Sequence, residues 1–273
     1  MPEIQQRRLG RTNLMVNEIG LGAMDTPNSP AGAQTLRTAE NGGINFVDTA
    51  REYSGSEFLI GQHVRELGKT SFLLASKTFS RNINGSQRDI DKSIATLGVK
   101  YLPLYQLHDI SSPESWAEVC DENEGALAGL KIAQFRGLIN HIGVSSHNTK
   151  LLEELIKSNE FDTVMLEYSA FYPDTASIID LAVEYDIGVI VMRPVGGSGR
   201  ASAIRTAITD GYNGPRTPAN LLRYVLANPG VSVAIPGTRY PSHVIENIAT
   251  AIKSTPMSKM EAANLEAEAA RLY

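Results

Sequence analysis

The chain has 273 residues, of which 42% are hydrophobic and 20% are charged, and its formal net charge is −5. This balance is typical of a globular protein with a large core, and it excludes a surface built to bind nucleic acid or an anionic membrane. The single cysteine, Cys120, excludes a disulfide framework and is expected to be a small packing residue. The N-terminal segment has no apolar core of a signal peptide, and no run approaches about 18 apolar residues. We therefore expect a cytoplasmic protein.

Short apolar ends flank a Thr-Asn turn in RRLGRTNLMV (7–16), which predicts a small N-terminal β-hairpin. After it, strand-like runs alternate with amphipathic helical stretches. Residues 148–159 show apolar residues at helical spacing, Thr217 before Pro218 marks the start of another helix, and residues 258–273 predict a C-terminal helix. The eight predicted strands are residues 17–24, 44–50, 71–79, 101–108, 140–146, 163–171, 187–195 and 231–238.

Eight β/α units favour a closed (β/α)8 TIM barrel that forms a single domain over residues 1–273. The strands are nearly continuous apolar runs, as expected for a parallel sheet covered on both faces. The alternative is a doubly wound open sheet, which usually carries a glycine-rich turn after the first strand and an acidic residue about 20 residues later. GLGAM (20–24) is not followed by this pattern, and GGSGRA (196–201) lacks the third glycine.

Active sites of (β/α)8 barrels lie at the carboxyl ends of the strands, where four polar residues stand in this chain. Asp48 lies at the end of the second predicted strand and Tyr53 follows in the next turn. Lys77 lies at the end of the third strand and His108 at the end of the fourth. Because these strands are neighbours in a closed barrel, we expect the four side chains to converge at its mouth.

These four residue types suit general acid catalysis on a carbonyl group. A free phenol titrates near ~10, and the ammonium of Lys77 is expected to lower the pKa of Tyr53 by favouring the phenolate. Asp48 would keep Lys77 charged, and His108 could hydrogen-bond the carbonyl oxygen. Taken singly, each residue also has a simpler structural interpretation, as a helix cap, a rim ion pair, a backbone-bonded histidine or a packed ring. A metal site is disfavoured, since lysine and tyrosine are uncommon ligands.

The segments DTAREYSGSE (48–57), LLASKTF (73–79), LYQLHDI (104–110), HIGVSS (141–146) and IPGTRYPSHVIENI (235–248) resemble the signature segments of the aldo-keto reductases. The resemblance covers almost the whole chain, in the family's order. It implies a (β/α)8 barrel that reduces aldehydes or ketones with a nicotinamide cofactor, usually NADPH, and without a metal. It also implies Tyr53 as the acid, Lys77 and Asp48 as the groups that tune it, and His108 as the group that orients the carbonyl.

The resemblance further implies an extended cofactor across the barrel mouth. MRPVGGSGR (192–200) would form the loop after the seventh strand and offer backbone amides to the pyrophosphate, with a flexible linker as the alternative. The residues implied near the nicotinamide are Gly22, Ala23, Met24, Asp48, Ser145, Met165 and Met192. Those implied near the pyrophosphate are Arg193, Pro194, Gly196, Gly197, Ser198, Gly199 and Arg200. Those implied near the adenosine and its 2′-phosphate are Ile235, Gly237, Thr238, Arg239, His243, Glu246 and Asn247.

Several positions depart from the family's pattern. Met165 stands where a Gln is common, and Met192 replaces an aromatic residue that stacks on the nicotinamide. A Lys and an Arg often found at the 2′-phosphate are Gly237 and His243 here, which weakens the expected preference for NADPH over NADH. Arg239 could supply the charge instead.

Three functions remain open on the sequence. The first is an NADPH- or NADH-dependent reductase of a small carbonyl compound, acting as a monomer or weak oligomer. The second is an aldolase-type barrel lyase in which Lys77 forms a Schiff base. The third is a cofactor-binding regulatory subunit with little turnover. The tail after residue 258 supplies no long loop, which suggests an open substrate pocket.

Overall fold

The computed structural model describes residues 3–68, 70–253 and 255–272, apart from the side chain of Ser198. An antiparallel pair opens the chain, formed by β1 (Gln6–Arg8) and β2 (Met15–Asn17), with Arg7 opposite Val16. A short 3-10 turn over Gly10–Thr12 connects them. The hairpin predicted over residues 7–16 is therefore present.

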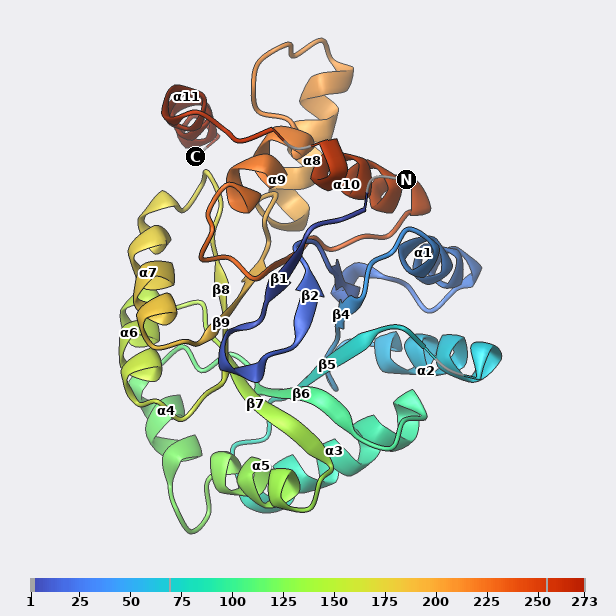
Figure 1. Cartoon of the computed structure of the whole chain (residues 1–273), viewed down its shortest axis with the longest axis vertical. Coiled ribbons are helices and arrows are strands. Elements are labelled where there is room, and N and C mark those ends of the chain that lie inside the picture. The colour runs from blue at the N-terminus through green and yellow to red at the C-terminus, as the bar shows by residue number, and fades with distance from the viewer. Residues whose placement is uncertain (1–2, 69, 254, 273) are drawn as a thin grey trace.

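Among the described residues, eight parallel strands form the central sheet in the order β10-β9-β8-β7-β6-β5-β4-β3 (Figure 1). Parallel bridges from Ile19 to Ala234 and from Gly22 to Gly237 join the first strand to the last and close the barrel. Each of the eight predicted strands overlaps one of them, so the (β/α)8 prediction is confirmed. The strands are β3 (Leu21–Gly22), β4 (Phe46–Asp48), β5 (Leu73–Thr78), β6 (Leu102–Leu107), β7 (Ile139–Ser145), β8 (Thr163–Glu167), β9 (Gly188–Met192) and β10 (Val233–Ile235).

Helices surround the barrel on its outer face (Figure 1). Thr217 accepts a hydrogen bond from the Asn220 N–H ahead of α9, as the sequence pattern predicts. Ser258 caps α11 in the same way. The last residue of the predicted C-terminal helix, Tyr273, lies outside the described residues. The helices are α1 (Pro30–Asn41), α2 (Ser56–Leu67), α3 (Ile83–Leu97), α4 (Pro113–Cys120), α5 (Ala126–Phe135), α6 (Thr149–Lys157), α7 (Ala176–Glu184), α8 (Gly197–Thr209), α9 (Pro218–Leu226), α10 (Pro241–Lys253) and α11 (Lys259–Ala270).

The N-terminal hairpin closes one end of the barrel. Leu9 and Val16 are fully buried and pack with the residues that fill the barrel interior, among them Phe46 and Leu104. Gly10 adopts a φ of +49°, and a Cβ at this position would lie 2.1 Å from the backbone N of residue 188. The hairpin thus lies directly against β9, and apolar burial holds it there. Ligands must reach the interior from the opposite end, where the carboxyl ends of the strands lie.

Across residues 3–68, 70–253 and 255–272, no helix has the length and apolar character needed to span a bilayer.

Candidate active site

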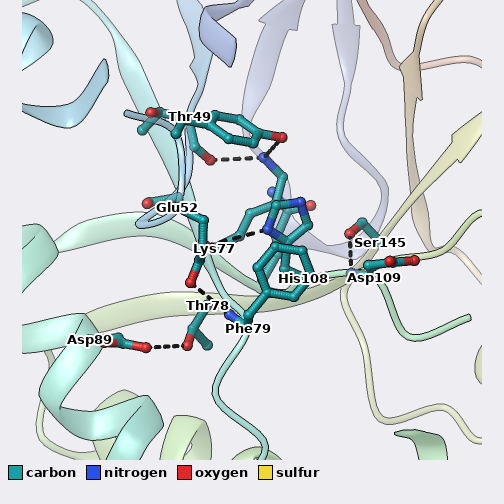
Figure 2. A network of polar contacts seen from close by, with 12 residues as sticks. Thr49, Glu52, Lys77, Thr78, Phe79, Asp89, His108, Asp109 and Ser145 are labelled. Atoms are coloured by element: carbon teal, nitrogen blue, oxygen red, sulfur yellow. Dashed lines mark hydrogen bonds and ion pairs between the residues drawn. The ribbon is translucent and has the colours of Figure 1, made fainter. Parts of the chain in front are cut away.

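Lys77 lies at the centre of a polar cluster at the carboxyl ends of β4, β5 and β6. Its side chain is fully buried, and its Nζ donates to Asp48 Oδ1 at 2.6 Å and to the Thr49 carbonyl oxygen at 2.8 Å. A third, longer contact of 3.4 Å joins Nζ to the Tyr53 hydroxyl. Figure 2 shows Lys77 beside Thr49. Three donors of the ammonium are thus used, and the orientation of Lys77 is fixed.

Gln106 completes the surroundings of Asp48. Lys77 and Gln106 are register partners on β5 and β6, and the Gln106 amide donates to Asp48 Oδ2 at 3.0 Å. Both Asp48 and Gln106 are buried, and Gln106 Oε1 has no hydrogen-bond partner among the described residues. The sequence reasoning missed Gln106. Its position two residues before His108, on the same face of the strand, was the available signal.

Burial acts against the charges of Asp48 and Lys77, and their contact opposes this effect. Burial works to lower the pKa of Lys77, but the neighbouring Asp48 carboxylate and Tyr53 hydroxyl outweigh it, so that the pKa lies above its ordinary value. Burial raises the pKa of Asp48, while Lys77 and Gln106 oppose this rise. Lys77 is accordingly an ammonium at neutral pH.

The pKa of Tyr53 is raised, whereas the sequence analysis predicts that Lys77 lowers it. Tyr53 lies in the turn after β4, and its ring centroid is 4.7 Å from Lys77 Nζ. Burial raises the pKa of Tyr53 above its ordinary value, and Lys77 opposes this rise without overcoming it. The negative charge of Asp48, which is paired with the ammonium, acts in the same direction as burial. Tyr53 therefore holds its proton at neutral pH.

His108 follows β6 and faces the same cluster. Its ring stacks on Phe79, with centroids 4.0 Å apart and an interplanar angle of 21°, and it meets the edge of Tyr53 at 5.5 Å. Burial and the positive charge of Lys77 hold the pKa of His108 below its ordinary value, against the opposing effect of Glu52. The imidazole is therefore neutral at pH 7. The structure brings Asp48, Tyr53, Lys77 and His108 together.

A cavity of about 760 Å³ opens at this end of the barrel. Tyr53, His108 and Asp48 line it, while Lys77 is fully buried and is not among the lining residues. The residues proposed for the cofactor that line it are Gly22, Met24, Asp48, Ser145, Met165, Met192, Arg193, Pro194, Gly196, Gly197, Gly199, Arg200, Ile235 and Gly237. Lining residues that the sequence reasoning did not single out are Asp25, Glu52, Phe79, His147, Val195 and Ala201.

The glycine-rich run differs from its expected form. The loop after β9 is shorter than predicted, because α8 begins at Gly197 and residues 197–200 form its first turn. Gly196 adopts a left-handed conformation with a φ of +90°, which turns the chain into the helix. Arg200 lies 5.1 Å from the ring centroid of Phe171. Ser198 was also proposed for the cofactor, and its side chain lies outside the described residues.

The residues proposed for the adenosine end lie at the end of β10, in the segment after it and on α10, and of these Ile235 and Gly237 line the cavity. Arg239 forms an ion pair with Asp25 at 3.2 Å. Burial and the charge of Arg205 hold the pKa of His243 below its ordinary value, so His243 is neutral at pH 7.

The remaining adenosine-end residues are engaged within the protein. Glu246 pairs with Arg205 at 2.7 Å. Thr238 is buried, and its hydroxyl donates to the Pro236 carbonyl oxygen. Asn247 is buried as well, and Ala23 is buried at the nicotinamide end.

A second charged group lies on the cavity wall at the ends of β8 and β9. Glu167 Oε1 lies 2.6 Å from His147 Nδ1 and 2.9 Å from an Arg193 nitrogen. Burial opposes the ionisation of Glu167, but these contacts hold its pKa below the ordinary value. Arg193, which lines the cavity, is thereby held in place.

The described residues contain no group of three or more His, Cys, Asp or Glu side chains placed to hold a metal ion. Burial raises the pKa of Cys120 to about 12, so this thiol is not a nucleophile at neutral pH.

Comparison with known proteins identifies the family. A model described as the aldo/keto reductase family matches residues 18–216. The chain therefore belongs to the aldo/keto reductase family, whose members are oxidoreductases acting on carbonyl groups.

Two relatives illustrate the sequence similarity. An uncharacterized oxidoreductase, YqkF, of Bacillus subtilis (strain 168) is 28% identical over 207 residues, which cover 70% of this chain and 65% of that protein. The chain thus spans about two thirds of that relative's length. L-galactose dehydrogenase of Arabidopsis thaliana is 26% identical, with 98% of this chain and 95% of that protein covered.

Solved structures agree with the barrel fold. An aldo-keto reductase from Klebsiella pneumoniae in complex with NADPH has a TM-score of 0.72 at 24% identity and covers 98% of this chain and 95% of its own. The holo form of an aldo-keto reductase from Bacillus halodurans has a TM-score of 0.77 at 20% identity, with coverages of 97% and 96%.

Proposed function

We propose that the chain reduces an aldehyde or ketone to the alcohol with NADPH or NADH, and that Tyr53 donates the proton. The observation that carries this proposal is the pair of contacts made by Lys77, which binds the Asp48 carboxylate at 2.6 Å and reaches the Tyr53 hydroxyl at 3.4 Å. Such a cluster supplies an acid and a cation that stabilises its conjugate base.

The cavity has the chemical features that a dinucleotide requires. Met165 and Met192 offer apolar surface to a flat ring. Ser145 lies beside them, and its hydroxyl accepts from the Asp109 N–H while keeping its own proton for a ligand. Arg193 and the first turn of α8 line the same cavity, and cations and helix N-termini attract phosphate. When bound, the nicotinamide supplies the hydride that the carbonyl carbon receives.

The described side chains have distinct roles in the proposed reaction. Because Lys77 donates to the Tyr53 oxygen, the phenolic proton remains available for the carbonyl oxygen. As Tyr53 gives up that proton, the Lys77 ammonium stabilises the phenolate, which solvent then reprotonates. Asp48 keeps Lys77 charged throughout, and His108 lies where it can contact the substrate oxygen.

NADPH is the proposed cofactor, with NADH as the alternative. Arg239 is the cation proposed to face the 2′-phosphate near Gly237, but it is already paired with Asp25. His243 is neutral at pH 7 and adds no charge. These features favour a modest rather than an absolute preference for the 2′-phosphate.

The Schiff-base alternative is less well supported. A lysine must be a neutral amine to attack a carbonyl, whereas the pKa of Lys77 is raised and its ammonium makes three contacts. The regulatory alternative shares this geometry, so turnover distinguishes it. We retain a monomer or weak oligomer and a cytoplasmic location as parts of the proposal.

Fluorescence titration with NADPH and NADH in parallel, followed by turnover assays with a panel of aldehydes and ketones, tests the proposal. Cofactor binding with carbonyl-dependent consumption supports a reductase. Binding without consumption of any carbonyl supports the regulatory subunit. A mass increase on Lys77 after borohydride treatment with a carbonyl compound supports the lyase.

A further inference from the structure

The chain turns sharply just after β6, at the residue that follows His108. Asp109 adopts a left-handed conformation with a φ of +54°, which aspartate tolerates better than most residues do. In an extended strand successive carbonyl groups point to opposite sides, whereas here the Arg81 guanidinium binds the carbonyl oxygens of both His108 and Asp109. The left-handed residue therefore brings two neighbouring carbonyl groups to the same side of the chain.

Arg81 reaches this turn from the segment between β5 and α3. Its Nη1 donates to the His108 carbonyl oxygen at 2.9 Å, and its Nη2 donates to the Asp109 carbonyl oxygen at 3.0 Å. A planar guanidinium presents its donors in a rigid fork, whereas a lysine ammonium is a point charge on a flexible stem. The Arg81 carbonyl oxygen accepts from the Ala126 N–H at 2.9 Å, which anchors the arginine to the start of α5.

The turn and the imidazole beside it are held by further contacts. The Asp109 N–H donates to the Ser145 hydroxyl at 2.9 Å (Figure 2). Phe79 stacks on the His108 ring, and the guanidinium carbon of Arg81 lies 5.8 Å from the Phe79 ring centroid. Arg81 therefore lies against His108 in two ways, through the backbone of the turn and through the ring that stacks on the imidazole.

Arg81 is half-buried and keeps its charge at neutral pH. Burial lowers the pKa of Arg81, and the charges of Asp109, Glu118 and Glu52 oppose this effect. A guanidinium stays protonated in a protein despite such a change. Arg81 is not among the described residues that line the cavity, so its influence on a ligand there passes through the residues that it holds.

We propose that Arg81 is a positioning residue for His108, because its grip on both carbonyl oxygens of the turn sets the direction in which the imidazole faces the cavity. The inference rests on the proposed function, in which His108 contacts the oxygen of the carbonyl substrate. That oxygen must meet the imidazole and the Tyr53 hydroxyl together, so a small rotation of the His108 ring would separate the two contacts. The loss should appear mainly in kcat, since a misaligned substrate still binds but reacts slowly.

Three substitutions at position 81 separate the fork from the charge. Arg81→Met removes the guanidinium and keeps an unbranched side chain. Arg81→Lys keeps a positive charge without the fork. Arg81→Ala leaves space in which a free guanidinium ion can take the place of the missing group. The matched control is Arg88→Met, because Arg88 is an exposed residue on α3.

Kinetics of carbonyl reduction give the first test. We expect kcat to fall by ~10–100-fold in Arg81→Met and to recover only in part in Arg81→Lys. NADPH affinity should change less than about twofold, because Arg81 lies apart from the cavity. Arg88→Met should match the native protein. Native kcat in Arg81→Met overturns the proposal.

Chemical rescue separates the placement of His108 from a general loss of structure. Guanidinium ion, at concentrations that do not unfold the native protein, should restore part of the kcat of Arg81→Ala, and ammonium ion at equal concentration should not. Equal effects of the two ions overturn the proposed role of the fork.

Proton–carbon spectra of the histidine rings in the ligand-free protein test the placement without turnover, with His108→Asn used to assign the signal. We expect the His108 Hε1 signal, shifted by the Phe79 ring, to move in Arg81→Met and to stay in place in Arg88→Met. In Arg81→Ala it should return toward its native position when guanidinium is added. An unmoved signal in a folded Arg81→Met variant overturns the proposal.

Two further outcomes are decisive. If Arg81→Met does not fold, Arg81→Lys takes its place, and a native His108 signal with native kcat in that variant overturns the need for the fork. If the native protein turns over no carbonyl compound while the His108 signal moves as expected, the proposed function fails and the role of Arg81 in placing His108 stands.

Discussion

The ammonium of Lys77 lies 2.6 Å from the Asp48 carboxylate, and both side chains are withdrawn from solvent within the barrel. Removing one partner of a buried ion pair leaves the other charge without compensation. Lys77→Met should therefore lower the free energy of unfolding by ~3–5 kcal/mol. The double variant Lys77→Met/Asp48→Asn should be more stable than Lys77→Met by ~1–3 kcal/mol, since no charge is then stranded. Urea denaturation measures both, and equal stability of Lys77→Met and the native protein would contradict the coupling.

Tyr53→Phe removes the proposed acid and little else. Loss of a positioned general acid should reduce kcat for carbonyl reduction by ~10²–10⁴-fold. Cofactor affinity by fluorescence titration should change less than about twofold, because the phenol oxygen contacts Lys77 and not the cofactor residues. Tyr101→Phe, which removes an exposed phenol, serves as the control. Full activity in Tyr53→Phe would refute the assigned role.

The ionisation of Tyr53 should limit reduction only at high pH. Burial raises the pKa of Tyr53, and the acid must be protonated to act, so activity is retained below this pKa and lost above it. The alkaline limb of the kcat profile should consequently lie above about pH 10. Stopped-flow or steady-state rates up to about pH 10.5, with unfolding monitored in parallel, measure it. An alkaline limb near pH 8 that disappears in Tyr53→Phe would show that the phenol is more acidic than this environment allows.

Asp25 places a negative charge on the wall of the cofactor cavity and pairs with Arg239. Asp25→Asn removes repulsion toward phosphate and leaves the Arg239 charge available to it. NADPH affinity should rise by ~2–5-fold, with a smaller gain for NADH, and the gain should shrink at high salt. Asp174→Asn, on an exposed residue, is the control. An equal increase in affinity for NADPH and NADH would argue against Arg239 as the group that binds the 2′-phosphate.

The barrel was predictable because each buried parallel strand is a short continuous apolar run, and the turns between runs are well marked. Residues 73–78 and 102–107 illustrate this, and their polar ends follow from the direction of parallel strands. The convergence of Asp48, Lys77 and His108 could be predicted because they follow three successive strands, which are neighbours in a closed barrel.

The features that the sequence did not predict depend on distances between side chains in the folded protein, which the spacing of residues along the chain does not determine. The contact of Glu52 with His108 joins the turn after β4 to the end of β6, and both residues line one cavity. The pKa of Tyr53 was misjudged because the sequence indicates a nearby lysine but not how deeply the phenol is buried. The glycine run could not be divided between loop and helix, since Gly197 and Gly199 are poor helix formers that begin α8 nonetheless.

The packing of Leu9 and Val16 across one end closes the barrel on that side. Cofactor and substrate must then enter and leave at the carboxyl ends of the strands. The ligand that binds deeper in the cavity has to bind first and dissociate last. If the dinucleotide lies beneath the carbonyl compound, this architecture alone dictates an ordered kinetic scheme.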